Sequence, residues 1–509
     1  MSRRPAGLVA AGDGQKRNVP RGGTPPRIRA RAILAGALVV LVAGVMVWRL
    51  VHLQILEADR YVARGASQRI RTVPLHAARG AIVDRNGVDL ALSVPRHSLV
   101  ADPRLVDDPV HTAQVLGPLL GVEPLVLEER LASERKFVYL ARQVDDRVAQ
   151  AALGLHLSGI DTRDEQSRVR PDDRSVLAVV GRTDIDGQGI SGLEKVYDSL
   201  LAGTAGEKIV EVGARGATIP GGEYHLTPAT EGRTLVLTLD RSLQFGAQQA
   251  LTNGVEAADA SGGILVAMRP WTGEILATVS VERDHDGVVT PSTEHRAVTW
   301  SYEPGSIIKP LTFAALLDGG LAKSDTISEV PYRIRVHDSD FTDSSPHELE
   351  EWTVAEIVTR SSNVGTILWA QEIGAVAFHA KLVDFGLGQV TGLGFPGEAR
   401  GILPPVAQWS GTSLPTIAIG QGVATTPIQM LTSYAALANR GFQPAPTLVL
   451  GTRDDGGVFS PRRVRPSMTV VPVAVASEVV AMLERVVEAG TGTRAQVTGY
   501  RVAGKTGTA

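Results

Sequence analysis

The sequence predicts an α+β protein of several domains that begins with a single membrane-spanning helix. At 509 residues the chain exceeds what one ordinary core organises, which suggests two or more domains. Residues 32–48 form an uncharged apolar run long enough to cross a hydrocarbon layer as a helix. Beyond this run, strand-like segments precede a mostly helical part with Gly-rich connections, which indicates helices packed around an antiparallel sheet.

The composition excludes several classes of function. Hydrophobic residues make up 43% and charged residues 21% of the chain, and the formal net charge is -3. The bulk of the chain therefore lacks the basic footprint of a nucleic-acid-binding protein, and we expect no nucleic acid as a partner. Cysteine is absent, which excludes disulfides, thiolate metal sites and cysteine nucleophiles.

A basic tail precedes the apolar run. Residues 1–31 carry one acid, Asp13, and a set of basic residues: Arg3, Arg4, Lys16, Arg17, Arg21, Arg27, Arg29 and Arg31. By the positive-inside rule, this tail, which we expect to be disordered, is cytoplasmic, and the chain beyond an anchor at 32–52 is extracytoplasmic. A cleaved signal peptide is the alternative, but Trp48, Arg49 and Leu50 stand where a small-residue cleavage site should be.

The chain beyond the anchor is expected to form two domains, at 53–232 and 233–509. The segment "RGAIVDRNGVDLALSV" predicts a hairpin with its turn at Asn86-Gly87. Residues 213–233 are rich in Gly, Pro and Thr, which favours a boundary there. The second domain then opens with a strand at 234–240, a helix at 241–256, and two strands within 262–281 around a turn at 270–273.

The segment "EPGSIIKPLTFAALLDGG" predicts a helix that starts near Ser306 and stops at Gly319-Gly320. Ser306 and Lys309 are three residues apart and would share a face, where partial burial would lower the pKa of the lysine and allow it to take the serine proton. Alone, the pattern is weak, because Ser306 could be only an N-cap and the same spacing recurs at Ser133 and Lys136 in a charged stretch.

Two further short motifs follow in the chain. Ser361 and Asn363, in "TRSSNVG", could aim a hydroxyl and an amide into one cleft, although a turn at a helix end is the simpler interpretation. The segment "AGKTGTA" offers ammonium, hydroxyl and amide donors around a glycine that admits close backbone approach, and alone it favours an edge strand. Its candidate residues are Lys505, Thr506, Gly507 and Thr508.

Together the three motifs occur in the order found in penicillin-recognising acyltransferases. On these residues the chain resembles class B penicillin-binding proteins, the membrane-anchored peptidoglycan D,D-transpeptidases. "RGAIVDRNG" is similar to the hallmark of their dimerisation-type pedestal domain, and residues 90–103 are similar to the septal, cell-division subgroup. The resemblance implies an elongated α+β pedestal and a penicillin-binding, serine beta-lactamase-like transpeptidase domain.

The resemblance also implies a role for each candidate residue. Ser306 would be acylated by the D-Ala-D-Ala end of a stem peptide, with Lys309 as the base. Ser361 would relay protons to the leaving amine and Asn363 would bind the substrate amide. Lys505, Thr506 and Thr508 would receive the terminal carboxylate, with Gly507 as a further substrate-binding residue, and the backbone amides of Ser306 and Thr508 would form the oxyanion hole. Beta-lactams would inhibit, a membrane glycosyltransferase and other divisome proteins would be partners, and no metal or cofactor is implied.

The position of the last motif raises a separate expectation. In the resembled fold, strands that follow the Lys-Thr-Gly strand lie between it and the strands at 263–281. Without them the Lys-Thr-Gly strand would lack its ladder partner. We therefore expect the printed chain to be a transpeptidase domain without its C-terminal strands and with weak or absent activity, the full chemistry belonging to a longer parent.

Three alternatives stay open at this point. The chain could be a catalytically inert membrane-anchored divisome scaffold, a beta-lactam sensor, or a serine beta-lactamase. The acidic and histidine-rich segment "VHDSDFTDSSPHELEE" could also be a metal site, but its irregular spacing favours a solvated loop. The candidate ligands there are His337, Asp338, Asp340, Asp343 and His347.

Overall fold

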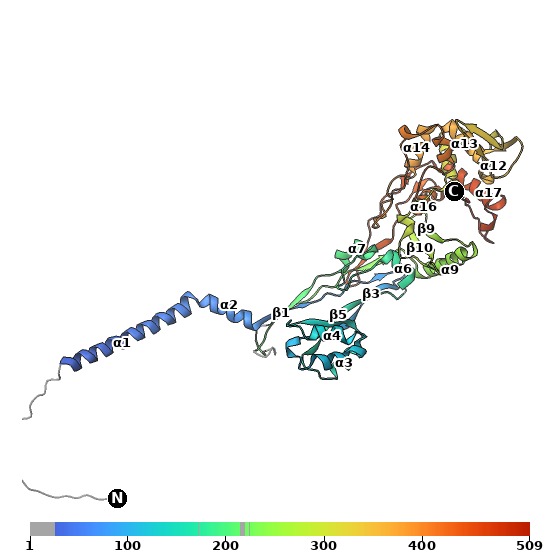
Figure 1. Ribbon diagram of the computed structural model, residues 1–509. Coiled ribbons are helices and arrows are strands. Elements are labelled where there is room, and N and C mark those ends of the chain that lie inside the picture. Colours follow the sequence, from blue (N-terminus) through green and yellow to red (C-terminus); the bar gives the residue numbers. More distant parts are fainter. Residues whose placement is uncertain (1–25, 172, 214–218, 223, 509) are drawn as a thin grey trace, which may run out of the picture. The chain divides into compact units, whose positions relative to one another are not determined.

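The computed structural model describes residues 26–171, 173–213, 219–222 and 224–508 (Figure 1). The chain divides into two compact units. The first unit comprises Met1–Val73 and Glu207–Thr227, and the second comprises Pro74–Gly206 and Pro228–Ala509.

The first unit contains the expected apolar helix. Helix α1 (Pro26–Val51) continues into a π-helical turn, η1 (His52–Leu56), and residues 28–56 are long and apolar enough to cross a membrane. The helix begins at Pro26, so Pro26–Arg31 are helical where we expected a disordered tail. Proline is tolerated there because a first-turn amide has no partner within the helix. The rest of the tail lies outside the described residues. Helix α2 (Ala58–Arg69) follows, with a sheet in the order β1-β6-β7: Ile70–Leu75, Gly206–Glu211 and Tyr224–Thr227.

The second unit opens with the predicted hairpin. Strands β2 (Ile82–Val83) and β3 (Asp89–Ala101) pair antiparallel, and Gly87 in their turn has φ +86°. Strand β3 also pairs with β4 (Val138–Val144) and β5 (Ile160–Val169). A core of buried apolar residues joins these strands to α3 (Pro109–Leu120), α4 (Pro124–Leu131) and α5 (Asp146–Leu153), and a 3-10 turn, η2 (Pro103–Leu105), follows β3.

One sheet continues across the expected boundary at 232–233. Its strand order is β18-β17-β8-β2-β3-β4, and β8 (Thr234–Leu237) pairs in parallel with β2, with Ile82 opposite Leu235. The other partners of β8 come from much later in the chain, β17 (Val449–Arg453) and then β18 (Phe459–Pro461). The predicted strand at 234–240 is thus confirmed, while the domain boundary stays a prediction.

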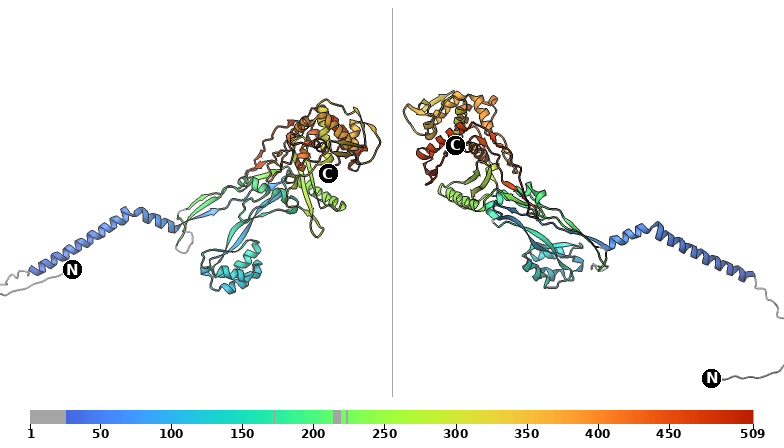
Figure 2. Two further views of the ribbon diagram at one scale, coloured as in Figure 1. Left: turned by 45° about the horizontal axis from the view of Figure 1, so that its top comes forward. Right: turned by 180° about the vertical axis from the view of Figure 1, so that it is seen from behind.

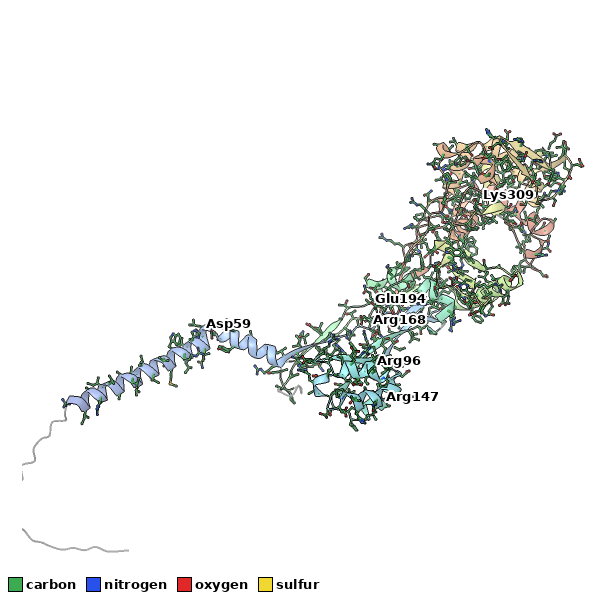
Figure 3. The ribbon with its side chains drawn as sticks, in the orientation of Figure 1. Asp59, Arg96, Arg147, Arg168, Glu194 and Lys309 are labelled. Carbon is green, nitrogen blue, oxygen red and sulfur yellow. The ribbon has the colours of Figure 1, made fainter. Side chains whose placement is uncertain are left out.

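A buried ion-pair network lies beside this sheet. The carboxylate of Glu194 is fully buried and accepts hydrogen bonds from Arg79 Nε and Arg168 Nε, each at 2.7 Å. Figure 3 shows Glu194 and Arg168 side by side. Arg79 is the first residue of "RGAIVDRNG", so this segment is fixed by charge as well as by its strand. Three short helices surround the network: α6 (Asp173–Val180), α7 (Gly192–Val196) and α8 (Asp198–Leu201).

A second sheet carries the predicted pair of strands. Strands β9 (Gly262–Arg269) and β10 (Glu274–Arg283) pair antiparallel around a turn that contains Gly273, and β11 (Val289–Pro291) extends the sheet. Helix α9 (Arg241–Ala257) packs on β9 and β10 through Ala247 and Val255 (Figure 1). The predicted helix at 241–256 and both strands are confirmed.

The rest of the second unit is mostly helical around one large apolar core. Figure 2 shows the C-terminal end beside these helices in both views, and Gly504 N donates to Leu483 O of α17 at 3.2 Å. The helices are α10 (Arg296–Thr299), α11 (Lys309–Asp318), α12 (Val354–Arg360), α13 (Asn363–Ile373), α14 (Ala375–Asp384), α15 (Ser413–Ala418), α16 (Pro427–Ala438) and α17 (Val473–Ala489), with 3-10 turns η3 (Gly305–Ile308), η4 (Val406–Gln408) and η5 (Thr493–Ala495). Short strand pairs are β12 (Ile327–Val330) with β15 (Glu350–Thr353), β13 (Arg333–Val336) with β14 (Ser339–Thr342), and β16 (Phe442–Gln443) with β19 (Met468–Thr469).

Candidate active site

The turn that carries Ser306 is held by close contact between two glycines. Ser306 lies in η3, which leads directly into α11, so the predicted helix start is confirmed. Gly305 has φ +55°, and its amide donates to Gly420 O at 2.9 Å. A Cβ on Gly420 would lie 2.0 Å from Gly305 O, so only glycine permits this approach. Ser306 is half-buried, and its hydroxyl has no hydrogen-bond partner among the residues that the structure describes.

A buried tyrosine supports the same turn from α16. Tyr434 Oη donates to Ile307 O at 2.7 Å, and burial raises the pKa of this phenol, so it stays a donor. Thr312 Oγ1 in α11 donates to Ala418 O at 3.0 Å and ties the helix to the segment that ends in Gly420. Sequence reasoning missed Gly420 and Tyr434 as parts of the site. The "IGQG" glycines were the available signal, but spacing alone does not show what they approach.

Lys309, labelled in Figure 3, is fully buried at the first position of α11, and its hydrogen bonds connect it to the second motif. Its Nζ donates to Ser361 O at 2.6 Å and to Asn363 Oδ1 at 2.7 Å, and Ser361 Oγ lies 3.4 Å away. The pKa of Lys309 is lowered to about 7, first by burial and then by the charge of Lys505, while the charge of Asp343 opposes the shift. A neutral amine can give its two protons to the two carbonyl oxygens and keep a lone pair free to accept a proton.

Ser361 lies between two amines. It terminates α12 in the left-handed conformation, with φ +62°, which a non-glycine residue adopts at a cost of about 1–3 kcal/mol. This geometry aims its carbonyl oxygen at Lys309, while its Oγ accepts a hydrogen bond from Lys505 Nζ at 2.7 Å. One residue therefore contacts both lysines, and its hydroxyl is placed to pass a proton between them.

Asn363 begins a helix rather than ending one. It is the first residue of α13, with Ser362 as N-cap, so the predicted turn separates two helices. Its Nδ2 donates to Thr342 O at 3.0 Å, which leaves Oδ1 facing Lys309. The structure thus brings the second motif into direct contact with Lys309.

The third motif reaches the site without forming a strand. Residues 501–508 are not in a strand, so the expected edge strand is wrong. The physical reason is that no other strand of the described residues lies beside this segment to form a ladder. Gly507 nevertheless passes against the Ser306 turn, because a Cβ there would lie 2.8 Å from Ile307 Cγ2 and 3.3 Å from Pro304 O. Thr506 Oγ1 lies 2.7 Å from Thr491 Oγ1, and Thr508 is exposed.

Lys505 is the second amine with a shifted pKa. Burial lowers its pKa to about 8, and its Nζ also donates to Thr506 O at 2.9 Å. Two ammonium groups around one hydroxyl would repel each other, which favours one neutral and one charged lysine near neutral pH. The more buried Lys309 is the better candidate for the neutral member, and the exposed side of Lys505 is the better candidate for binding an anion.

The segment proposed as a solvated loop has a different structure. Residues 333–342 form the β13–β14 hairpin, and His337, Asp338 and Asp340 are exposed, as expected of a solvated segment. The interpretation as a solvated loop is wrong for Asp343, which is buried against the second motif, and for His347, which is half-buried against Asp343. The described residues contain no group of His, Asp and Glu arranged to hold a metal ion. The competing serine-lysine pair is confirmed as surface: Ser133 Oγ donates to Arg130 O at 2.8 Å and Lys136 is exposed.

Fold and site together define a structural class, in which a serine and a buried lysine stand one turn apart at a helix start, the pair of residues that serine acyltransferases with a lysine base use. Comparisons with known proteins identify the family. Residues 74–237 match the Penicillin-binding Protein dimerisation domain, and residues 263–509 match the Penicillin binding protein transpeptidase domain. The chain belongs to the class B penicillin-binding proteins.

Individual relatives agree with this assignment. Penicillin-binding protein PbpB of Mycobacterium tuberculosis is 33% identical over 93% of this chain and 74% of its own length. Peptidoglycan D,D-transpeptidase FtsI of Escherichia coli is 31% identical over 94% of this chain and 81% of its own length. Among solved structures, penicillin binding protein 3 of M. tuberculosis in its apo form superposes with a TM-score of 0.65 at 29% identity, over 86% of this chain and 82% of that one.

Proposed function

We propose that the protein is a serine-type peptidoglycan D,D-transpeptidase that works in septal cell-wall synthesis and is sensitive to beta-lactams. The observation that carries the proposal is the environment of Lys309. Its amine is buried, has a lowered pKa, and gives its protons to Ser361 O and Asn363 Oδ1, one short turn after Ser306. A relative named for this activity, FtsI of E. coli, is 31% identical to the chain over 491 aligned residues.

In the acylation step, Ser306 Oγ attacks the carbonyl carbon of the penultimate D-alanine of a stem peptide. The hydroxyl proton passes to the lone pair of Lys309 as the Oγ–C bond forms. Collapse of the tetrahedral intermediate breaks the peptide bond, and the leaving D-alanine amine takes up the proton from Lys309 through Ser361 Oγ, which lies between the two lysines. The product is an ester on Ser306 and free D-alanine.

In the second step, the amine of a neighbouring strand attacks the ester carbonyl. Lys309, neutral again, accepts the amine proton, and the Ser306 oxygen leaves and is reprotonated. The intermediate is stabilised at the backbone amides of Ser306 and Thr508, a contribution typically worth about 3–4 kcal/mol per donor. The acyl group has then moved from serine to the acceptor amine, which is a cross-link.

Substrate orientation is assigned to the same residues. Lys505, as the charged amine of the pair, pairs with the terminal carboxylate together with the hydroxyls of Thr506 and Thr508, and Gly507 allows the substrate backbone close access to the turn at Ser306. Asn363 Nδ2 and Oδ1 are engaged in the free protein, so binding of the substrate amide exchanges one of these contacts. Beta-lactams would enter as mimics of the dipeptide; the M. tuberculosis penicillin binding protein 3 has been solved in complex with ampicillin and with aztreonam.

The location and partners follow from the helix and the chemistry. Helix α1 anchors the protein as a single-pass membrane protein with its N-terminus in the cytoplasm and the catalytic residues outside, where stem peptides are cross-linked. The domain division at 53–232 and 233–509 is proposed on the pedestal and transpeptidase motifs. A membrane glycosyltransferase that supplies new glycan strands, and other divisome proteins, are the proposed partners.

The test is to locate the acyl group. The full chain, solubilised in detergent, is incubated with fluorescent penicillin, digested, and analysed by mass spectrometry, alongside Ser306→Ala and the matched control Ser133→Ala. We expect an adduct on the peptide that contains Ser306 in the parent and in Ser133→Ala, and none in Ser306→Ala. The test depends on which residue is labelled, so it gives an answer even if the chain is acylated slowly. Absence of the adduct on Ser306 would overturn the proposal.

A second measurement separates the remaining alternatives. A transpeptidase keeps its penicilloyl ester for many turnover times, whereas a beta-lactamase hydrolyses it quickly, so persistence of the label after removal of free drug supports the proposal. A beta-lactam sensor would also keep the label, but it would release no D-alanine from a stem-peptide donor with an acceptor amine. An inert scaffold would show neither label nor release.

A further inference from the structure

We propose that Asp343 and His347, on the loop after β14, are positioning residues of the acyl-transfer site, which fix the start of α13 and hold the Asn363 amide with its oxygen towards Lys309. The inference rests on the proposed function, since it assigns these residues to that site. Neither residue belongs to the three sequence motifs. They were first considered as metal ligands, and their contacts in the structure give them another task.

The Asp343 carboxylate caps α13 from outside the helix. Its Oδ1 accepts hydrogen bonds from Asn363 N at 2.5 Å and Val364 N at 3.0 Å, and its Oδ2 accepts one from Ser362 Oγ at 2.7 Å. The first amides of a helix have no acceptor within it, so this carboxylate supplies what the helix lacks and complements its dipole. Asp343 is 8% exposed, so water does not compete for these bonds. The backbone of Asn363 is therefore fixed by Asp343.

The neighbouring Thr342 fixes the side chain of the same residue. Asn363 Nδ2 donates to Thr342 O at 3.0 Å. A backbone carbonyl can only accept, so the amide nitrogen must face Thr342 and the amide oxygen must face Lys309, where the distance from Nζ to Oδ1 is 2.7 Å. Thr342 and Asp343 thus hold the side chain and backbone of Asn363 together. A shift of Asp343 would therefore change the position of both the side chain and the backbone of Asn363.

His347 holds Asp343 in turn. Its Nε2 lies 3.1 Å from Asp343 Oδ2 and its Nδ1 lies 2.7 Å from Glu348 O, so an oxygen lies within hydrogen-bond distance of each ring nitrogen. The ring packs against Trp352 with centroids 4.6 Å apart, and it meets Tyr332 edge-on at 6.0 Å. A ring fixed on three sides determines where the Asp343 carboxylate lies.

Asp343 also acts on Lys309 through its charge. The charged groups that face Lys309 are Lys505, which lowers its pKa, and Asp343, which raises it; Ser361 and Asn363 are neutral. Asp343 itself faces His347, and the cleft beside it is also lined by Glu350, Glu356 and Arg360. Removing the Asp343 charge while keeping its shape should therefore lower the pKa of Lys309 further. This effect would not follow from a purely structural role.

The experiment compares Asp343→Asn with Asp340→Asn in the full chain. Asp340 lies on β14 of the same hairpin but pairs with Arg333 at the surface, so it is a matched control. We expect Asp343→Asn to lower the rate constant for acylation by labelled penicillin about 10- to 100-fold, the scale of a displacement near 1 Å. The lower limb of its pH profile should move to lower pH. The acylation rate constant of the control, Asp340→Asn, should stay within about twofold of that of the parent.

Hydrogen exchange makes the outcome independent of catalysis. The peptide that contains Asn363 and Val364 should exchange faster in Asp343→Asn and at the parental rate in Asp340→Asn. His347→Gln keeps an amide donor for Asp343, while His347→Phe keeps only a ring, so the first should retain more acylation than the second. These two variants decide the question if Asp343→Asn does not fold.

Three results would overturn the inference. The first is an Asp343→Asn variant that acylates at the parental rate with the lower limb of its pH profile at the parental pH. The second is an Asp343→Asn variant that acylates more slowly while hydrogen exchange at Asn363 and the lower limb of the pH profile are unchanged. The third is an equal acylation rate in His347→Gln and His347→Phe. If the parent chain forms no adduct on Ser306, the proposed function fails. In that case the exchange measurement alone decides whether Asp343 positions Asn363.

Discussion

Replacing Gly420 by alanine should displace the nucleophile although the substitution lies far from it in sequence. Gly420 has φ +90°, a conformation that costs an L-residue about 1–3 kcal/mol. The new Cβ would lie 2.0 Å from Gly305 O and 2.5 Å from Gly305 N, where ordinary contact begins at 3.4 Å. The Gly305 backbone must therefore retreat by more than about 1 Å, and Ser306 follows it. A misplacement on that scale costs about 100-fold in rate, or about 2.7 kcal/mol.

The assay is the second-order rate constant for acylation by fluorescent penicillin, with the melting temperature measured on the same samples. Gly422→Ala is the matched control, because Gly422 also has a positive φ, of +71°, but the nearest atom to its new Cβ, Thr416 Oγ1, is 3.5 Å away. Both variants should lose stability through backbone strain, and only Gly420→Ala should lose acylation about 100-fold. If the two variants acylate within about threefold of each other, backbone contact between Gly305 and Gly420 does not set the position of Ser306.

Three further predictions concern ionisable groups. The acylation rate should rise as pH increases through about 7, where Lys309 becomes a neutral base, and fall above about 8, where Lys505 loses its charge. Stopped-flow labelling at a series of pH values measures both the rise and the fall. A profile that shows only one of them would contradict the assignment of Lys309 as base and Lys505 as anion-binding group. Lys309→Met should abolish labelling yet keep or raise the melting temperature at pH 7. The pKa of Lys309 is lowered from 10.5 to about 7, so the lysine opposes folding at any pH below its unfolded pKa, and most strongly below about 7; a clear fall in melting temperature would refute this. Glu194→Gln should lower the free energy of unfolding by about 3–5 kcal/mol, because it leaves the buried guanidinium of Arg168 without the carboxylate it pairs with and leaves Arg79 with Asp198 alone. A urea titration showing less than about 1 kcal/mol would refute it.

Local patterns in the sequence predicted the local structure around the nucleophile. The Pro-Gly start and Gly-Gly stop gave the helix that carries Ser306 and Lys309, because capping and breaking signals act within a few residues. The same reasoning predicted partial burial of Lys309 and the direction of its pKa shift. The hairpin at Asn86-Gly87 and the strands around Gly273 were predictable for the same reason, since short turns have strong residue preferences.

Contacts between distant segments could not be read from spacing. Position 420 requires a glycine because the backbone of Gly305 lies against it, and Gly305 is far away in the sequence, at the start of the turn that leads into α11. Asp343 looked solvent-exposed because the groups that donate to its carboxylate lie on Ser362 and α13, and His347 also faces it, none of which is its immediate neighbour in the sequence. The prediction of a strand at Lys505 was wrong because a β-strand needs a hydrogen-bonded partner strand, and the sequence of the motif does not show whether such a partner lies beside it.

The parallel pairing of β2 with β8 has a consequence for anyone who wishes to exchange parts between relatives. A recombinant crossover at 232–233 looks natural from the motifs, yet it would join a β8 from one parent to a β2 from another, and Ile82 and Leu235 would have to match across the junction. Chimeras that transplant the catalytic half together with the hairpin at 79–101 should therefore express better than those cut at the linker.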